Sequence, residues 1–246
     1  EPGAASSVVQ AAANMLGGLD GLVNNAGGML GRIASTDMPP GHFDEVVNLN
    51  ARSVWEATVA AHPFLKAAGG YVINTSSVAA RTGGGAGAVL YAATKSFVSS
   101  LTRGHAKEFV RDGIRVNAVA PGLIQTPFHD KYTPPELLAQ QTASVPMGRE
   151  GTPEECVGAF LFLASPALSG YITGQIIEVR NAKEATIDFW GVRKLVRLDN
   201  LTERAVAGDY VIDHGGYAVR VIPTRDVADT QLLFDVIKGF DARDPY

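Results

Sequence analysis

The chain has 246 residues, a net charge of −4 and 46% hydrophobic residues. This length suits one large α/β domain, or one domain with a small appendage. The slight acidity and the lack of a basic stretch argue against nucleic acid as a partner. The single cysteine, Cys156, excludes an internal disulfide. No apolar run reaches membrane length and no signal-peptide pattern opens the chain, so we expect a cytoplasmic protein.

Strands and helices are predicted to alternate along most of the chain. The expected elements are a helix over 4–16, a strand over 21–24, a helix over 43–68 interrupted near Asn50, a strand over 71–75, a helix over 90–110, a strand over 115–119, a helix over 153–163 and a strand over 175–179. Residues 125–146 contain four prolines, and we expect a mobile region there. This alternation predicts an α/β fold with a parallel sheet.

A serine followed by a Tyr-x-x-x-Lys pattern is the main sign of chemistry. Tyr91 and Lys95 share one helix face, and Ser77 lies fourteen residues before Tyr91 at the end of a predicted strand. A Tyr and a Lys four residues apart on a helix are usually a surface pair. Here, however, they follow a strand end and a glycine loop at 83–87 and lie near the start of a helix, which is where α/β proteins place their sites. We expect the Lys95 ammonium to lower the pKa of Tyr91 from about 10, making it a general acid and base.

Six motifs in this order resemble those of the short-chain dehydrogenase/reductase family, close to its 3-oxoacyl-carrier-protein reductases. They are Asn24-Asn25-Ala26-Gly27, the helix around Asn50, Ser77 with Tyr91 and Lys95, the stretch 114–122 with Thr126, the stretch 151–155 and the stretch 171–175. The resemblance covers residues 1–179. It implies a doubly wound, Rossmann-like parallel sheet, N-terminally truncated, with a short α+β C-terminal extension.

The resemblance also implies roles for individual residues. The catalytic tetrad would be Ser77, Tyr91, Lys95 and Asn50, with Asn50 kinking its helix and positioning a water. A nicotinamide cofactor, NAD or NADP, would be bound by Asn24, Ala26, Gly27, Tyr91, Lys95, Pro121, Gly122, Ile124 and Thr126. Family members assemble through the helices that carry Asn50 and Tyr91, so a homodimer or homotetramer is expected.

The chain departs from the family at its start. Residues 1–3 correspond to a point beyond the family's third strand, and the glycine-rich turn that binds the cofactor pyrophosphate is absent from the sequence. We therefore expect weak binding of NAD(H) or NADP(H) by these 246 residues. The residue that selects between the two cofactors is absent as well.

The C-terminal stretch departs from the family too, so we expect residues 1–182 to form the catalytic domain and residues 183–246 an extension of unknown role. Residues 210–222 predict a β-hairpin that turns at 213–217. Residues 225–245 faintly resemble a helix and loop of the amidase signature family, without its catalytic motif. No phosphate-binding glycine spacing occurs in the extension, which argues against a circular permutation. A fusion, a frameshifted gene end or an engineered chimera would each explain the presence of residues 183–246.

Three functions remain open from the sequence. The leading hypothesis is an oxidoreductase that interconverts a carbonyl and an alcohol of a small molecule. The second is a hydrolase in which Ser77, Tyr91 and Lys95 attack an ester or lactone without a cofactor. The third is an inactive subunit. The five histidines show no metal-binding spacing, so no metal site is predicted.

Overall fold

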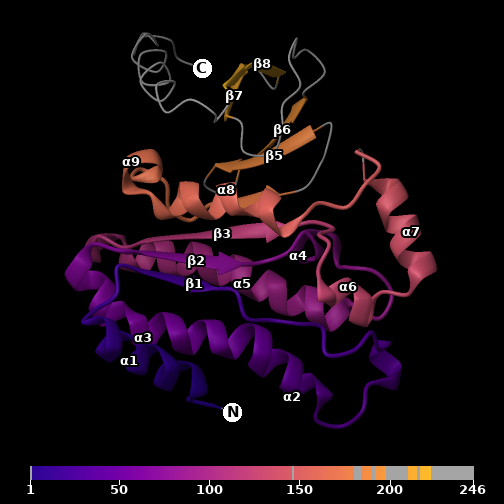
Figure 1. Ribbon diagram of the computed structural model, residues 1–246, viewed down its shortest axis with the longest axis horizontal. Coiled ribbons are helices and arrows are strands. Elements are labelled where there is room, and N and C mark those ends of the chain that lie inside the picture. Colours follow the sequence, from indigo (N-terminus) through magenta and orange to yellow (C-terminus); the bar gives the residue numbers. More distant parts are fainter. Residues whose placement is uncertain are drawn as a thin grey trace.

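The computed structural model describes residues 2–145 and 147–179, and the backbone of four strands within 184–222. Its first part is a three-layer α/β arrangement around a parallel sheet (Figure 1). The elements of this part are α1 (Ala4–Leu16), β1 (Gly21–Asn24), η1 (Ser35–Asp37), α2 (His42–Val47), η2 (Asn48–Arg52), α3 (Ser53–Ala68), β2 (Tyr71–Thr75), α4 (Ala79–Thr82), α5 (Val89–Phe109), η3 (Val110–Asp112), β3 (Arg115–Pro121), α6 (Pro127–Tyr132), α7 (Pro135–Ser144), α8 (Pro153–Ala164), α9 (Pro166–Ser169) and β4 (Ile176–Val179).

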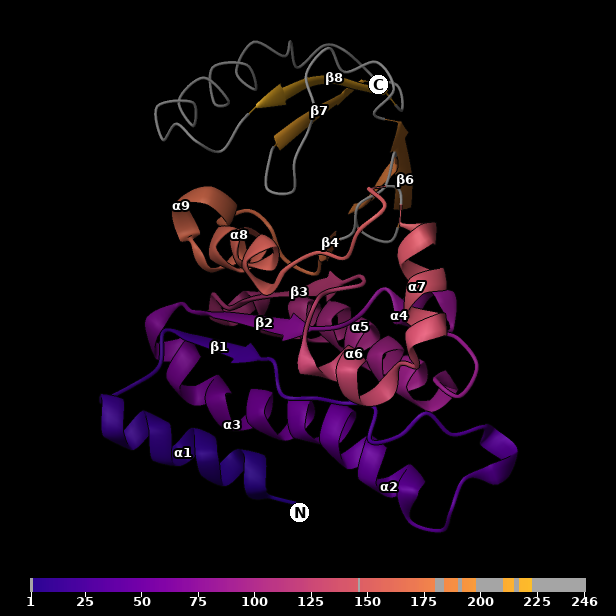
Figure 2. The same cartoon turned by 45° about the vertical axis from the view of Figure 1, so that its right-hand side comes forward.

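The sheet has the strand order β1-β2-β3-β4, and all its pairings are parallel. Each crossover runs through helices, as parallel pairing requires. Alternate strand residues face opposite layers, so Val72 and Val116 pack under α1, α3 and α5, whereas Ile73 and Val119 pack under α8. Figure 2 shows α1 and α3 on one side of the sheet and α8 on the other. The predicted α/β fold class is confirmed.

Helix α8 begins with a capping box, which fixes the loop before it. The Glu155 carboxylate accepts a hydrogen bond from the backbone N of Thr152 at 2.8 Å, and Pro153 occupies the first turn. Arg149 binds the same carboxylate at 2.6 Å. These bonds hold the pKa of Glu155 down at about 2. The start of α8 therefore anchors one end of the segment that carries α6 and α7.

The region 125–146, expected to be mobile, contains two helices, α6 and α7. Pro127 and Pro135 stand at the first helical position of each. A proline is well tolerated there because its missing N–H has no partner in the first turn of a helix. The prolines therefore begin these helices, and the mobility expected of this region stays a prediction.

A second sheet contains four strands, β5 (Glu184–Phe189), β6 (Val192–Arg197), β7 (Tyr210–His214) and β8 (Tyr217–Ile222), in the order β5-β6-β8-β7. Strands β7 and β8 pair antiparallel, which confirms the hairpin predicted over 210–222. The amidase-like stretch 225–245 lies outside the described residues.

Candidate active site

The candidate site lies where three parallel strands end at the same edge of the sheet. In the register of the sheet, Asn24 of β1 is level with Asn74 of β2, and Asn74 is level with Ala118 of β3. The segments that follow these strands therefore emerge together. Ligand sites of open α/β sheets are found at this carboxyl edge.

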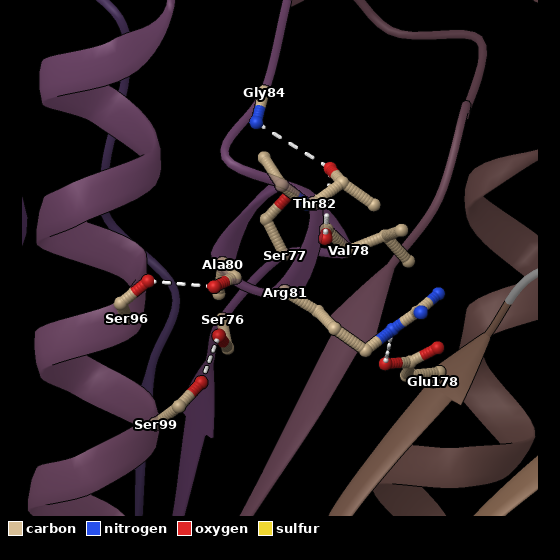
Figure 3. A network of polar contacts seen from close by, with 11 residues as sticks. Ser76, Ser77, Val78, Ala80, Arg81, Thr82, Gly84, Ser96, Ser99 and Glu178 are labelled. Atoms are coloured by element: carbon tan, nitrogen blue, oxygen red, sulfur yellow. Dashed lines mark hydrogen bonds and ion pairs between the residues drawn. The ribbon is translucent and has the colours of Figure 1, made fainter.

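Hydroxyl groups hold the segment after β2 against α5 (Figure 3). The Oγ atoms of Ser76 and Ser99 are 2.7 Å apart, and Ser96 Oγ donates to the backbone O of Ala80 at 2.7 Å. On the far side, Arg81 Nε lies 2.8 Å from Glu178 Oε1 of β4. The segment that carries Ser77 is therefore bound to both neighbouring elements.

Ser77 lies within hydrogen-bond reach of the Tyr91 hydroxyl, as the sequence predicts. Its Oγ accepts a hydrogen bond from the backbone N of Ala79 at 3.1 Å, which orients the hydroxyl. A side-chain hydrogen bond joins Ser77 to Tyr91. The structure thus brings together two side chains that stand fourteen residues apart in the sequence, across the loop and the start of α5.

The pKa of Tyr91 shifts in the direction opposite to the one expected from the sequence. Burial raises this pKa, and the hydrogen bond with Ser77 lowers it by a smaller amount. Desolvation disfavours the charged phenolate. The expectation of a lowered pKa is therefore wrong for this structure, because it counted the lysine charge and omitted the cost of burial. Tyr91 keeps its proton at neutral pH.

Lys95 is buried beside Tyr91, with 4% of its surface exposed. Its Nζ donates to the backbone O of Thr75 at 2.7 Å and lies 5.9 Å from the centre of the Tyr91 ring. Burial lowers the pKa of Lys95 from 10.5 to about 8. The ammonium is therefore still charged at neutral pH, although it lies in the interior.

Asn50 interrupts its helix and binds the loop after β1. It lies in η2, a π-helical segment between α2 and α3, so the predicted interruption is confirmed. Its Oδ1 accepts from the backbone N of Gly28 at 3.0 Å, and its Nδ2 donates to the backbone O atoms of Gly28 and Val46 at 2.8 and 3.0 Å. Both amide N–H groups are used in this way, so placement of a water by Asn50 stays a prediction.

At Gly27 the backbone passes close to two members of the tetrad. A Cβ at this position would lie 2.8 Å from Asn50 Oδ1 and 3.2 Å from Lys95 Nζ. Only glycine leaves this space open, and it adjoins the one charged amine of the tetrad. The bare backbone and the buried ammonium suit a hydroxyl-bearing, anionic group such as a nicotinamide dinucleotide, so these residues fit the predicted cofactor.

The other predicted cofactor residues lie near this space in different ways. Ala26 is exposed, whereas the Asn24 amide donates to Thr58 Oγ1 at 3.0 Å and Asn74 Oδ1 at 2.8 Å, and so holds β1 to its neighbours. After β3, the N–H of Gly122 donates to the backbone O of Val179 at 2.9 Å. Four residues of this segment are partly buried: Pro121, Gly122, Ile124 and Thr126. Their contact with a cofactor stays a prediction.

Phe128 of α6 is a site residue that the sequence analysis missed. Its ring lies 5.4 Å from the Tyr91 ring, and the Tyr132 ring packs edge-on against it at 5.3 Å. Its position two residues after Thr126, within the region expected to be mobile, was the available signal. Helix α6 thus covers the phenol with an aromatic side chain.

Among the described residues, no cluster of three or more histidine, cysteine or acidic side chains is placed to hold a metal ion. His129 Nδ1 instead lies 3.0 Å from Thr133 Oγ1, and His62 Nε2 lies 2.8 Å from Asp112 Oδ2. None of the described helices is long and apolar enough to span a bilayer.

A family model described as "Enoyl-(Acyl carrier protein) reductase" matches residues 1–181. General stress protein 39 of Bacillus subtilis is 39% identical over 181 residues, and the alignment covers 74% of this chain but only 62% of that protein. The 3-oxoacyl-[acyl-carrier-protein] reductase of Thermotoga maritima is 40% identical over 178 residues, which are 70% of this chain and 69% of that one.

A solved structure of similar fold is the NADH-dependent reductase A1-R' responsible for alginate metabolism, with a TM-score of 0.68 and 39% identity over 74% of this chain and 72% of that one. The fold, the tetrad and these matches define an α/β protein with a Ser-Tyr-Lys site. The chain belongs to the short-chain dehydrogenase/reductase family. A second model, of the HupF/HypC family, matches residues 172–234.

The relatives named above as reductases give the hydrolase alternative no support. Burial also raises the pKa of the Tyr91 phenol, which disfavours the phenolate that would have to take a proton from Ser77. That alternative is set aside.

Proposed function

We propose that this protein is a nicotinamide-dependent oxidoreductase that interconverts a carbonyl and an alcohol of a small molecule. The observation that carries the proposal is the protonated Tyr91 phenol, hydrogen-bonded to Ser77 and placed beside the buried Lys95 ammonium. A phenol that keeps its proton at neutral pH suits reduction, in which the carbonyl oxygen must gain a proton.

Each member of the tetrad has a role in this proposal. Tyr91 donates its proton to the substrate oxygen, and Ser77 hydrogen-bonds the same oxygen and holds the substrate in place. The charge of Lys95 stabilises the phenolate that remains after proton transfer. Asn50 is a positioning residue, because its hydrogen bonds to Gly28 fix the loop that lies over Lys95.

The cofactor would be NAD or NADP, which supplies the hydride when it is bound. Its nicotinamide half would lie against Gly27 and Lys95 on one side and the segment 121–126 on the other. Two relatives with solved structures are described as complexes with NAD and with NADH, which supports this cofactor class. The 246 residues contain no glycine-rich phosphate turn, so we expect them to bind the dinucleotide weakly.

Two measurements test the proposal. Calorimetric titration of the chain with NADH and NADPH measures the affinity for each cofactor. Reduction of a panel of small ketones and aldehydes is then followed through the nicotinamide absorbance, with Tyr91→Phe as the variant. The variant is expected to lose two or more orders of magnitude in kcat, the contribution of general acid catalysis at about 10²–10⁴. Near-normal turnover by Tyr91→Phe would remove the tetrad from the mechanism.

We also propose assembly into a homodimer or homotetramer through α3 and α5. Trp55 and Val59 of α3 are each 48% exposed, and Phe97 of α5 is 44% exposed. Apolar side chains gathered on neighbouring helices favour burial against a second copy. For residues 183–246 we propose a separate unit, supported by the change of matching family model near residue 181.

A further inference from the structure

Arg32 joins three segments at the mouth of the candidate active site. It follows the loop after β1, and its Nε donates to the backbone O of Tyr132 in α6 at 2.9 Å. Its Nη1 donates to the backbone O of Ala86, in the glycine loop before α5, at 2.8 Å. The neighbouring Ile33 N–H adds a bond to the backbone O of Gly87 at 3.1 Å. Arg32 thus lies between α6 and the start of the helix that carries Tyr91.

The segments that Arg32 joins are those that surround the reacting phenol. Tyr132, whose backbone O it binds, packs against Phe128, and Phe128 packs against Tyr91. The glycine loop passes so close to Arg32 that a Cβ at Gly87 would lie 2.7 Å from Arg32 Cγ. Arg32 is therefore connected to the surroundings of Tyr91 through α6 and the glycine loop.

The charge of Arg32 has no acidic partner within the described part of the chain. Arg81 and Arg149 each pair with a carboxylate, whereas Arg32 bonds only backbone oxygens, and no hydrogen bond there engages its Nη2. Burial alone lowers the pKa of Arg32. A partly buried cation without a counter-ion is costly, and an anion that reached it would relieve that cost.

Titratable groups near this position do not neutralise it. His129 faces Arg32 from α6, and the positive charge of Arg32 helps to lower the pKa of His129. The carboxylates of Asp130 and Glu150 act on His129 in the opposite direction, but neither forms an ion pair with Arg32. The free end of the guanidinium, with both N–H groups of Nη2 and one of Nη1, keeps the fork geometry that matches a carboxylate.

We propose that Arg32 binds an anionic group of the substrate, so that the protein acts on small oxo acids whose carboxylate docks on this guanidinium while the carbonyl meets Tyr91. This inference rests on the proposed function and narrows its substrate class. Arg32 is then a specificity-determining residue, and it couples docking of the anion to the position of α6.

The test measures binding rather than turnover, so that it does not depend on cofactor affinity. The 246-residue chain and its Arg32→Gln variant are titrated with acetoacetate and with its neutral methyl ester, followed by saturation-transfer NMR. Arg111→Gln removes the same charge from an exposed site at the opposite end of β3 and is the matched control. Loss of a hydrogen-bonded charge is expected to weaken acetoacetate binding at least about tenfold in Arg32→Gln. Arg32→Gln should bind the methyl ester as the parent chain does. Arg111→Gln should bind both acetoacetate and the ester as the parent chain does.

Other results would overturn the inference. Equal loss of both ligands in Arg32→Gln would show that Arg32 only holds α6 in place. Unchanged acetoacetate binding would show that the guanidinium does not touch the anion. Acetonylphosphonate serves as a third probe. If Arg32→Gln weakens binding of acetonylphosphonate but not of acetoacetate, the site binds a phosphate-like group instead of a carboxylate.

Failure of the proposed function would look different from failure of this inference. In a Tyr91→Phe background, Arg32→Gln should still weaken acetoacetate binding, because the carboxylate docks on Arg32 and not on the phenol. Lack of nicotinamide-dependent reduction alongside Arg32-dependent acetoacetate binding would contradict the oxidoreductase proposal and leave the anion site standing.

Discussion

Replacing Lys95 with methionine should make the protein more stable at neutral pH while abolishing its chemistry. Burial holds the pKa of Lys95 at about 8 instead of 10.5. At about 1.4 kcal/mol for each pH unit, this difference corresponds to roughly 3 kcal/mol of unfavourable free energy for the buried charge. Methionine removes the charge and keeps most of the volume, although it leaves the Thr75 carbonyl without its hydrogen bond. The net gain at pH 7 is then about 1–2 kcal/mol.

The pH dependence separates this effect from a general change in packing. Between pH 8 and 10.5 the unfolded chain holds the Lys95 proton and the folded protein has released it, so stability rises with pH in this window. Below pH 8 both states are protonated, and the penalty is present in full. The raised pKa of Tyr91 acts in the opposite direction only above its ordinary value of 10. The parent chain should therefore gain stability from pH 7 to 9.5, and Lys95→Met should gain less.

Urea unfolding followed by circular dichroism at pH 7, 8, 9 and about 9.5 measures this directly. Lys107→Met is the matched control, because Lys107 is an exposed lysine on the same helix. It should keep both the stability and the pH slope of the parent. If Lys95→Met is less stable than the parent at pH 7 and has the same slope, the ammonium is better solvated than its burial indicates, and the reasoning fails.

Three further predictions concern the surroundings of Lys95 and the surface. Gly27→Ala places a Cβ 2.8 Å from Asn50 Oδ1 and should lower the thermal midpoint and weaken cofactor binding, whereas Gly28→Ala meets only Leu49 at 3.6 Å and should be milder. Asn50→Ala leaves the buried N–H of Gly28 unpaired and should cost about 1–3 kcal/mol in urea unfolding, far more than Asn48→Ala, whose partner Arg52 is exposed. Trp55→Glu should shift the mass found by light scattering towards the monomer, and a parent chain that is already monomeric at micromolar concentration would contradict the proposed assembly.

Local patterns in the sequence were sufficient to predict most of the first sheet and its helices. The helix over 4–16 and the strands over 21–24 and 71–75 have the predicted bounds, because each is a short apolar run closed by glycine or polar residues. The helices that begin at Pro127 and Pro135 were not predicted, although proline is well suited to the first position of a helix. Its effect depends on its position in the helix, and the sequence does not state that position.

The proximity of the candidate site residues was predictable, whereas their energetics were not. Ser77, Tyr91, Lys95 and Asn50 are brought together as the motif order implies. The direction of the Tyr91 pKa was not predictable, because desolvation depends on how Phe128 and the surrounding segments cover the ring. The bonds from Asn50 to Gly28 and the bridge formed by Arg32 join residues distant in sequence, and no spacing rule describes them.

The position of β1 has a consequence for how this protein behaves in solution. In the described sheet β1 pairs only with β2, so its other side presents backbone N–H and C=O groups. Such an edge accepts a further strand through main-chain hydrogen bonds. Association through the backbone of β1 does not depend on the side chains of α3 and α5. Contacts of this kind between copies of these 246 residues would form at β1, and salt or substitutions on the helices would change them little.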